Sequence, residues 1–213
     1  MGPLTPEERR AKFANKSIQT GLRSKGFRKL TVEEQEKLLA NLSPEKTVSR
    51  LEELRVLREA SKSVKVPMET ELKVYELSAK EIIEQDKYDA LVPVLSNLVK
   101  LSDPKHLEDN FGSQNVTEIN HDKKLEKVYQ TYNWLYIILL SNTKQFNEAL
   151  ELCYDDRDFR YVRCILTNDQ PLLESFILNE TDSLSKQLMA KAPLNKYKDT
   201  IRWVFEHPSK RKK

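Results

Sequence analysis

The spacing of hydrophobic positions changes within one stretch of this chain, from Leu125 to Leu140. Its first apolar residues recur three or four positions apart, on one face of a helix: Leu125, Val128, Tyr129 and Tyr132. From Trp134 to Leu140 every residue is apolar. A buried strand is an alternative for these last seven residues, but the helical spacing leads directly into them. A helix that is hydrophobic on all sides must be surrounded by other elements, so we expect a central buried helix.

Amphipathic spacing and helix-end signals predict further helices on both sides of this stretch. The predicted helices cover residues 32–41, 43–61, 69–85, 88–101, 122–140, 144–153, 156–166, 170–178, 183–189 and 193–207. We expect Thr31 to begin a capping box, Ser43 and Asp155 to cap their helices, and Asp122 to cap the central one. The predicted inward-facing side chains include Val48, Leu150, Phe159 and Leu166.

The fold class follows from these patterns and from the glycine content. Only one of the four glycines lies beyond residue 26, too few for the turns of a β-rich fold. We therefore predict an all-α fold, an irregular α-solenoid of helical hairpins with flexible basic ends. The period is irregular, and no clean tetratricopeptide or HEAT consensus is present.

The predicted organisation has four parts and one long polar break. A basic arm covers residues 1–30, an N-terminal helical pair 31–66, a helical-repeat domain 69–207, and a basic tail 208–213. Residues 102–122 interrupt the repeat domain with a polar loop, which is either functional or a plain insertion.

The net charge of +3 hides an uneven distribution. Residues 1–30 carry a net charge of +6 and Lys210 to Lys213 add +4, which leaves the middle of the chain acidic. The arm either docks on a partner or nucleic acid, or acts as a solubilising tail. The C-terminal run resembles a nuclear localisation signal or a nucleic-acid patch, or is a solvated terminus. The candidate contact residues in these ends are Arg9, Arg10, Lys12, Arg23, Lys25, Arg28, Lys29, Lys210, Arg211, Lys212 and Lys213.

A second candidate contact surface lies around residues 157–163. Arg157, Arg160 and Arg163 alternate there with Phe159 and Tyr161. Such a pattern is typical of a stacking surface for single-stranded RNA, and an ordinary amphipathic helix explains it as well.

The residue inventory does not favour an enzyme. The three histidines are far apart and form no metal-ligand set, the glycines are too few for a phosphate-binding loop, and no G-x-S-x-G elbow occurs. Acidic pairs such as Asp155-Asp156 are explained as helix N-terminal charges. Cys153 and Cys164, without a signal-peptide or transmembrane pattern, predict two free thiols in a reducing compartment. We expect no catalytic residue, no metal, no cofactor, no small-molecule substrate and no membrane partner.

Three segments resemble PCI-type helical scaffolds, namely the small lid-type subunits of the proteasome and signalosome and the GANP-like scaffolds of messenger-RNA export. They are ELKVYELSAKEIIEQDKYDALVPVLSNL, KVYQTYNWLYIILLSNTKQFNEALEL and DFRYVRCILTNDQPLLESFIL. The resemblance covers a little over half the chain and implies a scaffold without catalytic residues. The winged helix that usually follows in that family is expected to be missing or reduced, because no strand alternation follows.

These patterns together predict a non-enzymatic adaptor subunit of a larger nuclear or nucleocytoplasmic complex. It would bind partner proteins through grooves between its helices. The alternative is a basic factor of ribosome biogenesis or RNA processing that binds RNA through its termini.

Overall fold

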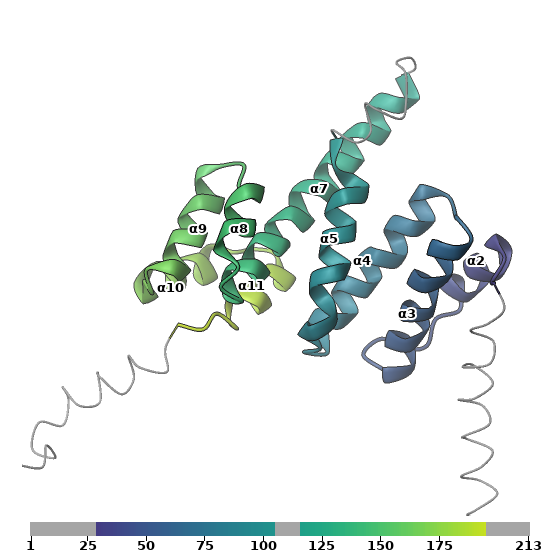
Figure 1. Cartoon of the computed structure of the whole chain (residues 1–213), viewed down its shortest axis with the longest axis horizontal. Helices are drawn as coiled ribbons and strands as arrows, with labels where there is room; N and C mark the ends of the chain where they lie inside the picture. Colours follow the sequence, from purple (N-terminus) through teal and green to yellow (C-terminus); the bar gives the residue numbers. More distant parts are fainter. Residues whose placement is uncertain (1–28, 105–115, 195–213) are drawn as a thin grey trace, which may run out of the picture. The chain divides into compact units, whose positions relative to one another are not determined.

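A computed structural model of the chain describes residues 29–104 and 116–194, apart from the side chains of 116–122. In these ranges all regular secondary structure is helical, so the predicted all-α class is confirmed (Figure 1). The chain divides into two compact units, Met1–Val74 and Tyr75–Lys213. The division falls inside α4 (Met68–Glu84), and each unit is described by itself below.

The first unit contains α2 (Val32–Ala40), α3 (Val48–Ser63) and the start of α4. The predicted capping box is confirmed, because Thr31 Oγ1 accepts from the Glu34 amide and the Glu34 carboxylate accepts from the Thr31 amide. The one buried side chain of α2 is Gln35, and its amide donates to the carbonyl oxygens of Leu30 and Val64 at 3.2 and 3.1 Å. These bonds connect the start of α2 with the end of α3.

The predicted start of α3 at Ser43 is wrong. Thr47 is the N-cap residue, and Ser43 binds the Glu53 carboxylate through both its amide and its hydroxyl group. Lys46 has a φ of 62°, so the backbone leaves the helical region before the helix begins. Val48, predicted to face inward, is 76% exposed because it occupies the first helical position, ahead of the turns that pack.

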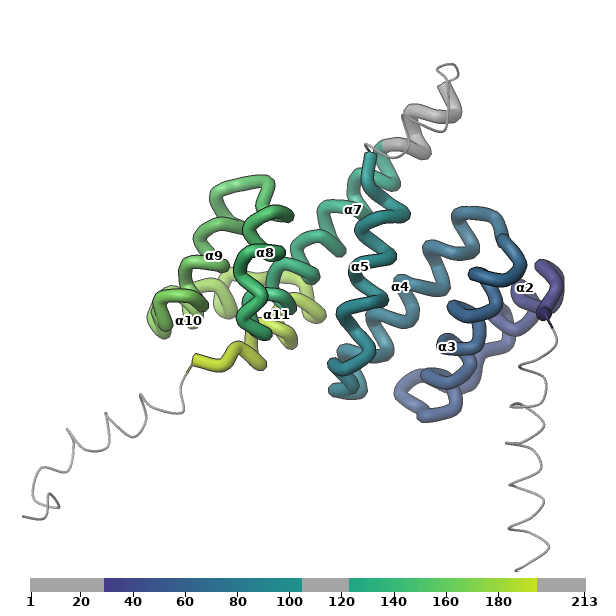
Figure 2. Tube along the Cα trace, in the orientation of Figure 1, coloured from purple at the N-terminus to yellow at the C-terminus, as the bar shows by residue number. Residues whose placement is uncertain are grey.

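The second unit is built around α7 (Val116–Asn142). This helix packs against α5 (Leu91–Ser102), α8 (Phe146–Leu152), α9 (Asp156–Leu166) and α11 (Ser183–Met189). Figure 2 shows α8 to α11 gathered beside the C-terminal half of α7. The side chains from Trp134 to Leu140 are at most 4% exposed, except for the half-buried Tyr136, so the predicted central buried helix is confirmed. The predicted cap at Asp122 is wrong, because α7 already begins at Val116.

Tight turns connect three pairs of consecutive helices in this unit. Asp86, Lys144 and Asn168 each have a φ between 55° and 62° and directly follow a helix. The next amide then donates five residues back, as in Lys87 N to Ile82 O at 3.0 Å. These are Schellman motifs, which satisfy the last carbonyl groups of a helix and reverse the chain at once. The turns lead into the 3-10 helix η1 (Tyr88–Ala90), α8 and α10 (Gln170–Asn179).

Several predictions concern residues outside the described ranges or are not tested by the fold. The arm up to residue 28, most of the 102–122 loop, most of the last helix and the basic tail lie outside these ranges. The predicted domain boundaries and the solenoid arrangement stay predictions. Over the part of the chain that the structure describes, none of the helices has the length and apolarity needed to cross a membrane.

Candidate functional site

Three aromatic rings from three helices meet beside the buried part of α7. Trp134 of α7 and Phe176 of α10 both contact Tyr161 of α9 edge to face, with ring centroids 5.5 and 5.3 Å apart. Such edge-to-face pairs are electrostatically favourable. Tyr161 is fully buried, and its hydroxyl group donates to the side-chain oxygen of Asn142 at 2.9 Å. Burial raises the pKa of Tyr161 above its usual value, so its hydroxyl group stays protonated. The cluster therefore fixes α7, α9 and α10 to one another.

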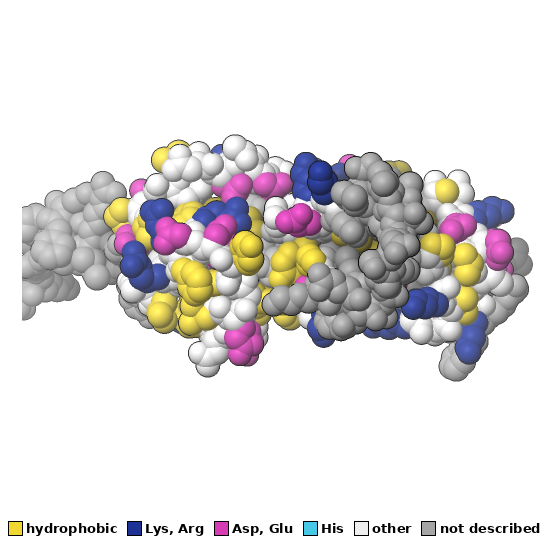
Figure 3. All heavy atoms as spheres, turned by 90° about the horizontal axis from the view of Figure 1, so that it is seen from above, with side chains coloured by type: hydrophobic (Ala, Val, Ile, Leu, Met, Phe, Trp, Pro, Cys, Tyr) yellow, Lys and Arg dark blue, Asp and Glu magenta, His cyan; other side chains and the backbone are white. Residues whose placement is uncertain are grey.

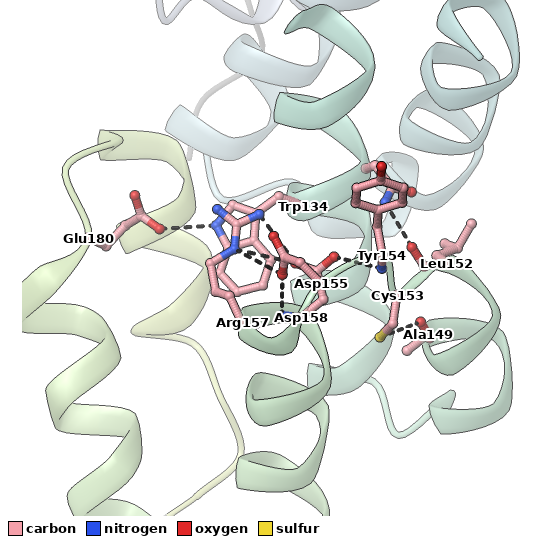
Figure 4. A network of polar contacts seen from close by, with 10 residues as sticks. Trp134, Ala149, Leu152, Cys153, Tyr154, Asp155, Arg157, Asp158 and Glu180 are labelled. Atoms are coloured by element: carbon pink, nitrogen blue, oxygen red, sulfur yellow. Dashed lines mark hydrogen bonds and ion pairs between the residues drawn. The ribbon is translucent and has the colours of Figure 1, made fainter. Parts of the chain in front are cut away.

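A ring of polar contacts covers the outer side of Trp134 (Figure 4). The Arg157 guanidinium group lies 4.1 Å from the centroid of the Trp134 ring, within the range of a cation–π contact. The Trp134 indole N–H donates to Glu180 Oε2 at 3.0 Å. Arg157 Nη2 also donates to Asp158 Oδ1 at 3.2 Å. These contacts link α7, α9 and the end of α10.

Asp158 is the buried charged group of this ring. It is 2% exposed, and its carboxylate accepts from the Tyr154 amide at 3.1 Å as well as from Arg157. Burial raises the pKa of Asp158, while these two donors lower it in part. Asp155 caps α9 by accepting from the Asp158 amide, which confirms the predicted cap. The role of Asp158 is thus to hold the α8–α9 connection in place.

A shallow hollow of about 220 Å³ opens between α9 and α10, above the edge of Trp134. Small-molecule sites usually measure about 300–1,000 Å³, so this hollow is smaller than a typical ligand pocket. It is lined by Trp134, Arg157, Arg160, Leu172, Ser175, Phe176, Asn179 and Glu180.

Large hydrophobic side chains are exposed around the same helices. Figure 3 shows hydrophobic side chains interleaved with basic and acidic ones on one face of the molecule. Within the described ranges, five of the six exposed large hydrophobic residues lie between positions 150 and 178. They are Leu150, Tyr154, Phe159, Leu166 and Leu178.

The predicted inward orientation is wrong for three of these side chains. Leu150, Phe159 and Leu166 were expected to face inward and are 42%, 48% and 57% exposed. The buried side chains of α9 are Asp158, Tyr161 and, as the helical spacing predicts, Val162, Cys164 and Ile165. Asp158 conceals the helical period of these buried positions in the sequence, because an aspartate is normally expected on the surface.

The predicted arginines of α9 have different surroundings. Arg157 and Arg160 line the hollow, and the Arg160 guanidinium group lies 5.9 Å from the centroid of the Phe176 ring. Arg163 is exposed and does not line the hollow. Since Tyr161 is fully buried, it cannot act as a stacking platform for RNA bases. Of the predicted contact residues in the basic ends, the structure describes only Lys29, which is exposed.

Cys153 ends α8 next to this surface, in surroundings that disfavour its thiolate form. Burial and the negative charges of Asp158 and Asp155 raise the pKa of the Cys153 thiol to about 11, which keeps it protonated and weakly nucleophilic. Its S–H group donates to the Ala149 carbonyl oxygen. Cys153 and Cys164 are both free, as predicted. Among the described residues, no group of three or more potential ligands is arranged to hold a metal ion.

The sequence analysis did not identify Trp134, Phe176, Glu180 or Ser175 as parts of one surface. They come from two helices and a helix end that are distant in the sequence. Only Trp134 carried a signal, as the first residue of the apolar run, and that signal indicated burial.

Comparison with known proteins finds no family model, no curated protein and no solved structure that matches this chain. The resemblance to PCI-type scaffolds therefore stays a prediction, and the site is interpreted from its own residues.

Proposed function

We propose that this chain is a non-enzymatic helical adaptor that binds partner proteins through the surface of α8, α9 and α10. In this proposal it is a subunit of a larger nuclear or nucleocytoplasmic complex. Its helices form an irregular solenoid of the PCI-like kind.

The observation that carries the proposal is that five of the six exposed large hydrophobic side chains in the described ranges come from α8, α9, α10 and the α8–α9 connection. Single exposed hydrophobic residues are normal on a protein surface, but a group of them marks an interaction site. Tyr154 and Leu178 are 85% and 79% exposed, and each would lose unfavourable contact with water on binding a partner. The five exposed hydrophobic side chains come from one set of successive helices, which favours a specific docking surface.

The composition of the hollow supports the same proposal. Its lining combines arginine with Trp134 and Phe176, and these residue types are enriched in the energetically important centres of protein interfaces. The hollow lies next to a rigid aromatic cluster, so a partner would meet a surface that is already ordered. A preorganised surface loses little conformational entropy on binding.

The nuclear or nucleocytoplasmic location rests on the basic run of Lys210 to Lys213, which resembles a localisation signal. The rival function, a basic factor that binds RNA through its ends, rests on the positive charge of residues 1–30 and 210–213. The two proposals differ in how binding depends on salt, because phosphate contacts weaken steeply as the salt concentration rises.

The test is purification of the tagged full chain from its own cells at high salt, with and without nuclease. We expect the same partner proteins to remain bound under both conditions. A double substitution, Phe159→Ser with Leu166→Ser, should release them, since it removes two exposed hydrophobic side chains of the proposed surface.

The control is Val48→Ser, which removes an even more exposed hydrophobic side chain from the first unit. Partners should remain bound to this variant. If nuclease or salt removes every partner, the RNA-binding rival is supported. If the double variant keeps every partner, the surface of α8 to α10 is not the docking site.

A further inference from the structure

We propose that the hollow between α9 and α10 binds a short acidic segment of a partner protein. One carboxylate of that segment would pair with Arg160, and a neighbouring apolar side chain would lie against Leu172 and Phe176. This inference rests on the proposed adaptor function and specifies the chemistry of its partner.

The two arginines of the hollow differ in how their charges are balanced. Arg157 lies over the Trp134 ring and is paired with Asp158 at 3.2 Å, with Asp155 at 4.0 Å. Arg160 lies over Phe176 and, among the described residues, has no carboxylate within ion-pair distance. Arg160 is therefore the positive charge of the hollow that remains available to a partner.

Glu180, whose carboxylate already lines the hollow, is not paired with Arg160. Glu180 Oε2 accepts from the Trp134 indole N–H (Figure 4). Glu180 Oε1 accepts from the amides of Thr181 and Asp182 at 3.0 Å each. These three bonds hold the carboxylate at the end of α10. An incoming carboxylate would thus meet Arg160 without displacing an existing ion pair.

A second donor lies in the same hollow. Ser175 Oγ accepts from the Asn179 side-chain amide at 3.3 Å, which leaves its O–H group free to donate. Arginine and serine together can satisfy both oxygens of a carboxylate, and hydrogen bonds to a charged group are stronger than neutral ones. The half-buried Leu172 and Phe176 form the apolar wall beside these donors.

The size of the hollow limits what it can bind. A volume of about 220 Å³ accommodates one or two side chains. A short segment with an acidic residue next to an apolar residue matches both the charge of Arg160 and the apolar wall.

A nucleic acid fits this hollow less well than an acidic peptide. Base stacking needs an exposed aromatic face, and of the two aromatic residues that line the hollow Trp134 is 4% exposed, while Phe176 is half-buried with Arg160 over its ring. A single carboxylate needs only Arg160 and Ser175.

The test is selection of short random peptides, displayed on phage, against the full chain. We expect the enriched peptides to carry Asp or Glu next to an apolar residue. Affinities of the enriched peptides are then measured by fluorescence anisotropy, together with versions in which Gln or Asn replaces the acidic residue. Arg160→Gln should weaken the acidic peptides by about tenfold or more, because the charged hydrogen bonds are lost.

The matched control is Arg163→Gln, which removes the same charge from an exposed position of α9 that does not line the hollow. It should leave the affinity nearly unchanged. Arg160→Glu should reverse the preference, so that peptides with Lys in place of the acidic residue bind more tightly than the original peptides. Circular dichroism of each variant verifies that the helices remain folded.

The inference is overturned by three results: enriched peptides without acidic residues, no enriched peptide at all, or equal effects of Arg160→Gln and Arg163→Gln. Binding of oligouridylate that depends on Arg160 and displaces the peptides would assign the hollow to RNA instead. If partner proteins still co-purify with the chain while any of these results is found, the adaptor function stands and only the assigned chemistry of the hollow is wrong.

Discussion

Helix α2 of the first unit and the long helix α7 of the second unit contact their neighbours through different kinds of buried side chain. The buried residue of α2 is Gln35, which connects α2 and the end of α3 through two hydrogen bonds. The buried residues of α7 are mainly apolar, and Leu135, Ile137 and Ile138 are fully enclosed. Helix α2 thus contributes a buried polar contact to a unit whose α3 also buries Leu54 and Leu57, whereas α7 contributes mainly apolar surface removed from water.

This difference predicts how each unit responds to substitution. A buried apolar side chain contributes about 1.5–3 kcal/mol through the hydrophobic effect, whereas an intramolecular hydrogen bond contributes about 1 kcal/mol net. Leaving a buried polar group without its partner costs about 1–3 kcal/mol. We therefore expect the greatest losses from truncating the apolar side chains of α7 and smaller, more local losses from removing the polar contacts of α2 and α3.

The largest effect is expected for Ile138→Ala in α7. The side chain is fully buried, so its truncation leaves a cavity and should lower the free energy of unfolding of the second unit by about 2–5 kcal/mol. Hydrogen exchange of the full chain, measured by mass spectrometry, should show faster exchange in α5 and in α7 to α11. Equal acceleration in α2 and α3 would contradict the division into two units.

The next effect is expected for Gln35→Leu in α2. Leucine cannot donate to the carbonyl oxygens of Leu30 and Val64, which should cost about 1–3 kcal/mol. Exchange should accelerate in α2 and at the end of α3 while α7 is unaffected. Gln35→Glu is a second variant, which keeps the shape of the side chain but also lacks the amide donors. If both variants exchange like the parent chain, these hydrogen bonds do not hold the first unit together.

A smaller effect is expected for Thr47→Ala at the start of α3. The threonine hydroxyl group accepts from the Arg50 amide, and its loss should cost about 1 kcal/mol. The neighbouring exposed Ser49 provides the control, because Ser49→Ala removes a hydroxyl group that does not cap the helix. Urea denaturation followed by circular dichroism measures both variants. A greater loss from Ser49→Ala than from Thr47→Ala would show that the cap does not stabilise α3.

The smallest effect on stability is expected at Cys153, where the prediction concerns the rate of alkylation. Its pKa is raised to about 11 from a model-compound value of 9.0, so less thiolate is present at pH 8 than for a free thiol. In a Cys164→Ser background, alkylation by iodoacetamide should be slower by at least about tenfold in the folded chain than in urea. The folded rate should continue to rise as the pH increases toward 11. A folded rate that levels off near pH 9 would show that the α8–α9 connection is open to water.

The local signals of the sequence were sufficient for the features that depend on neighbouring residues. The capping box of Thr31 and Glu34, the Asp155 cap and the bounds of α11 agree with the structure because each depends on residues within one turn. The buried α7 was predictable because a helix that is apolar on every side has one possible environment. Ser43 misled the prediction since Ser followed by Pro is a common helix start, and Glu53, ten residues away, binds Ser43 instead.

Tertiary packing decided the features of the candidate site. The sequence fixes the angular position of each side chain around its own helix axis, but the neighbouring helices determine which of those positions are covered. On α9 they cover Asp158 and Tyr161 and leave Phe159 exposed. The hollow exists because Trp134, Arg160 and Phe176 come together from three helices, and such long-range contacts leave no periodic trace in the sequence. The sequence alone therefore determined an all-helical chain with one enclosed helix, and the packing of α7, α9 and α10 determined its surface.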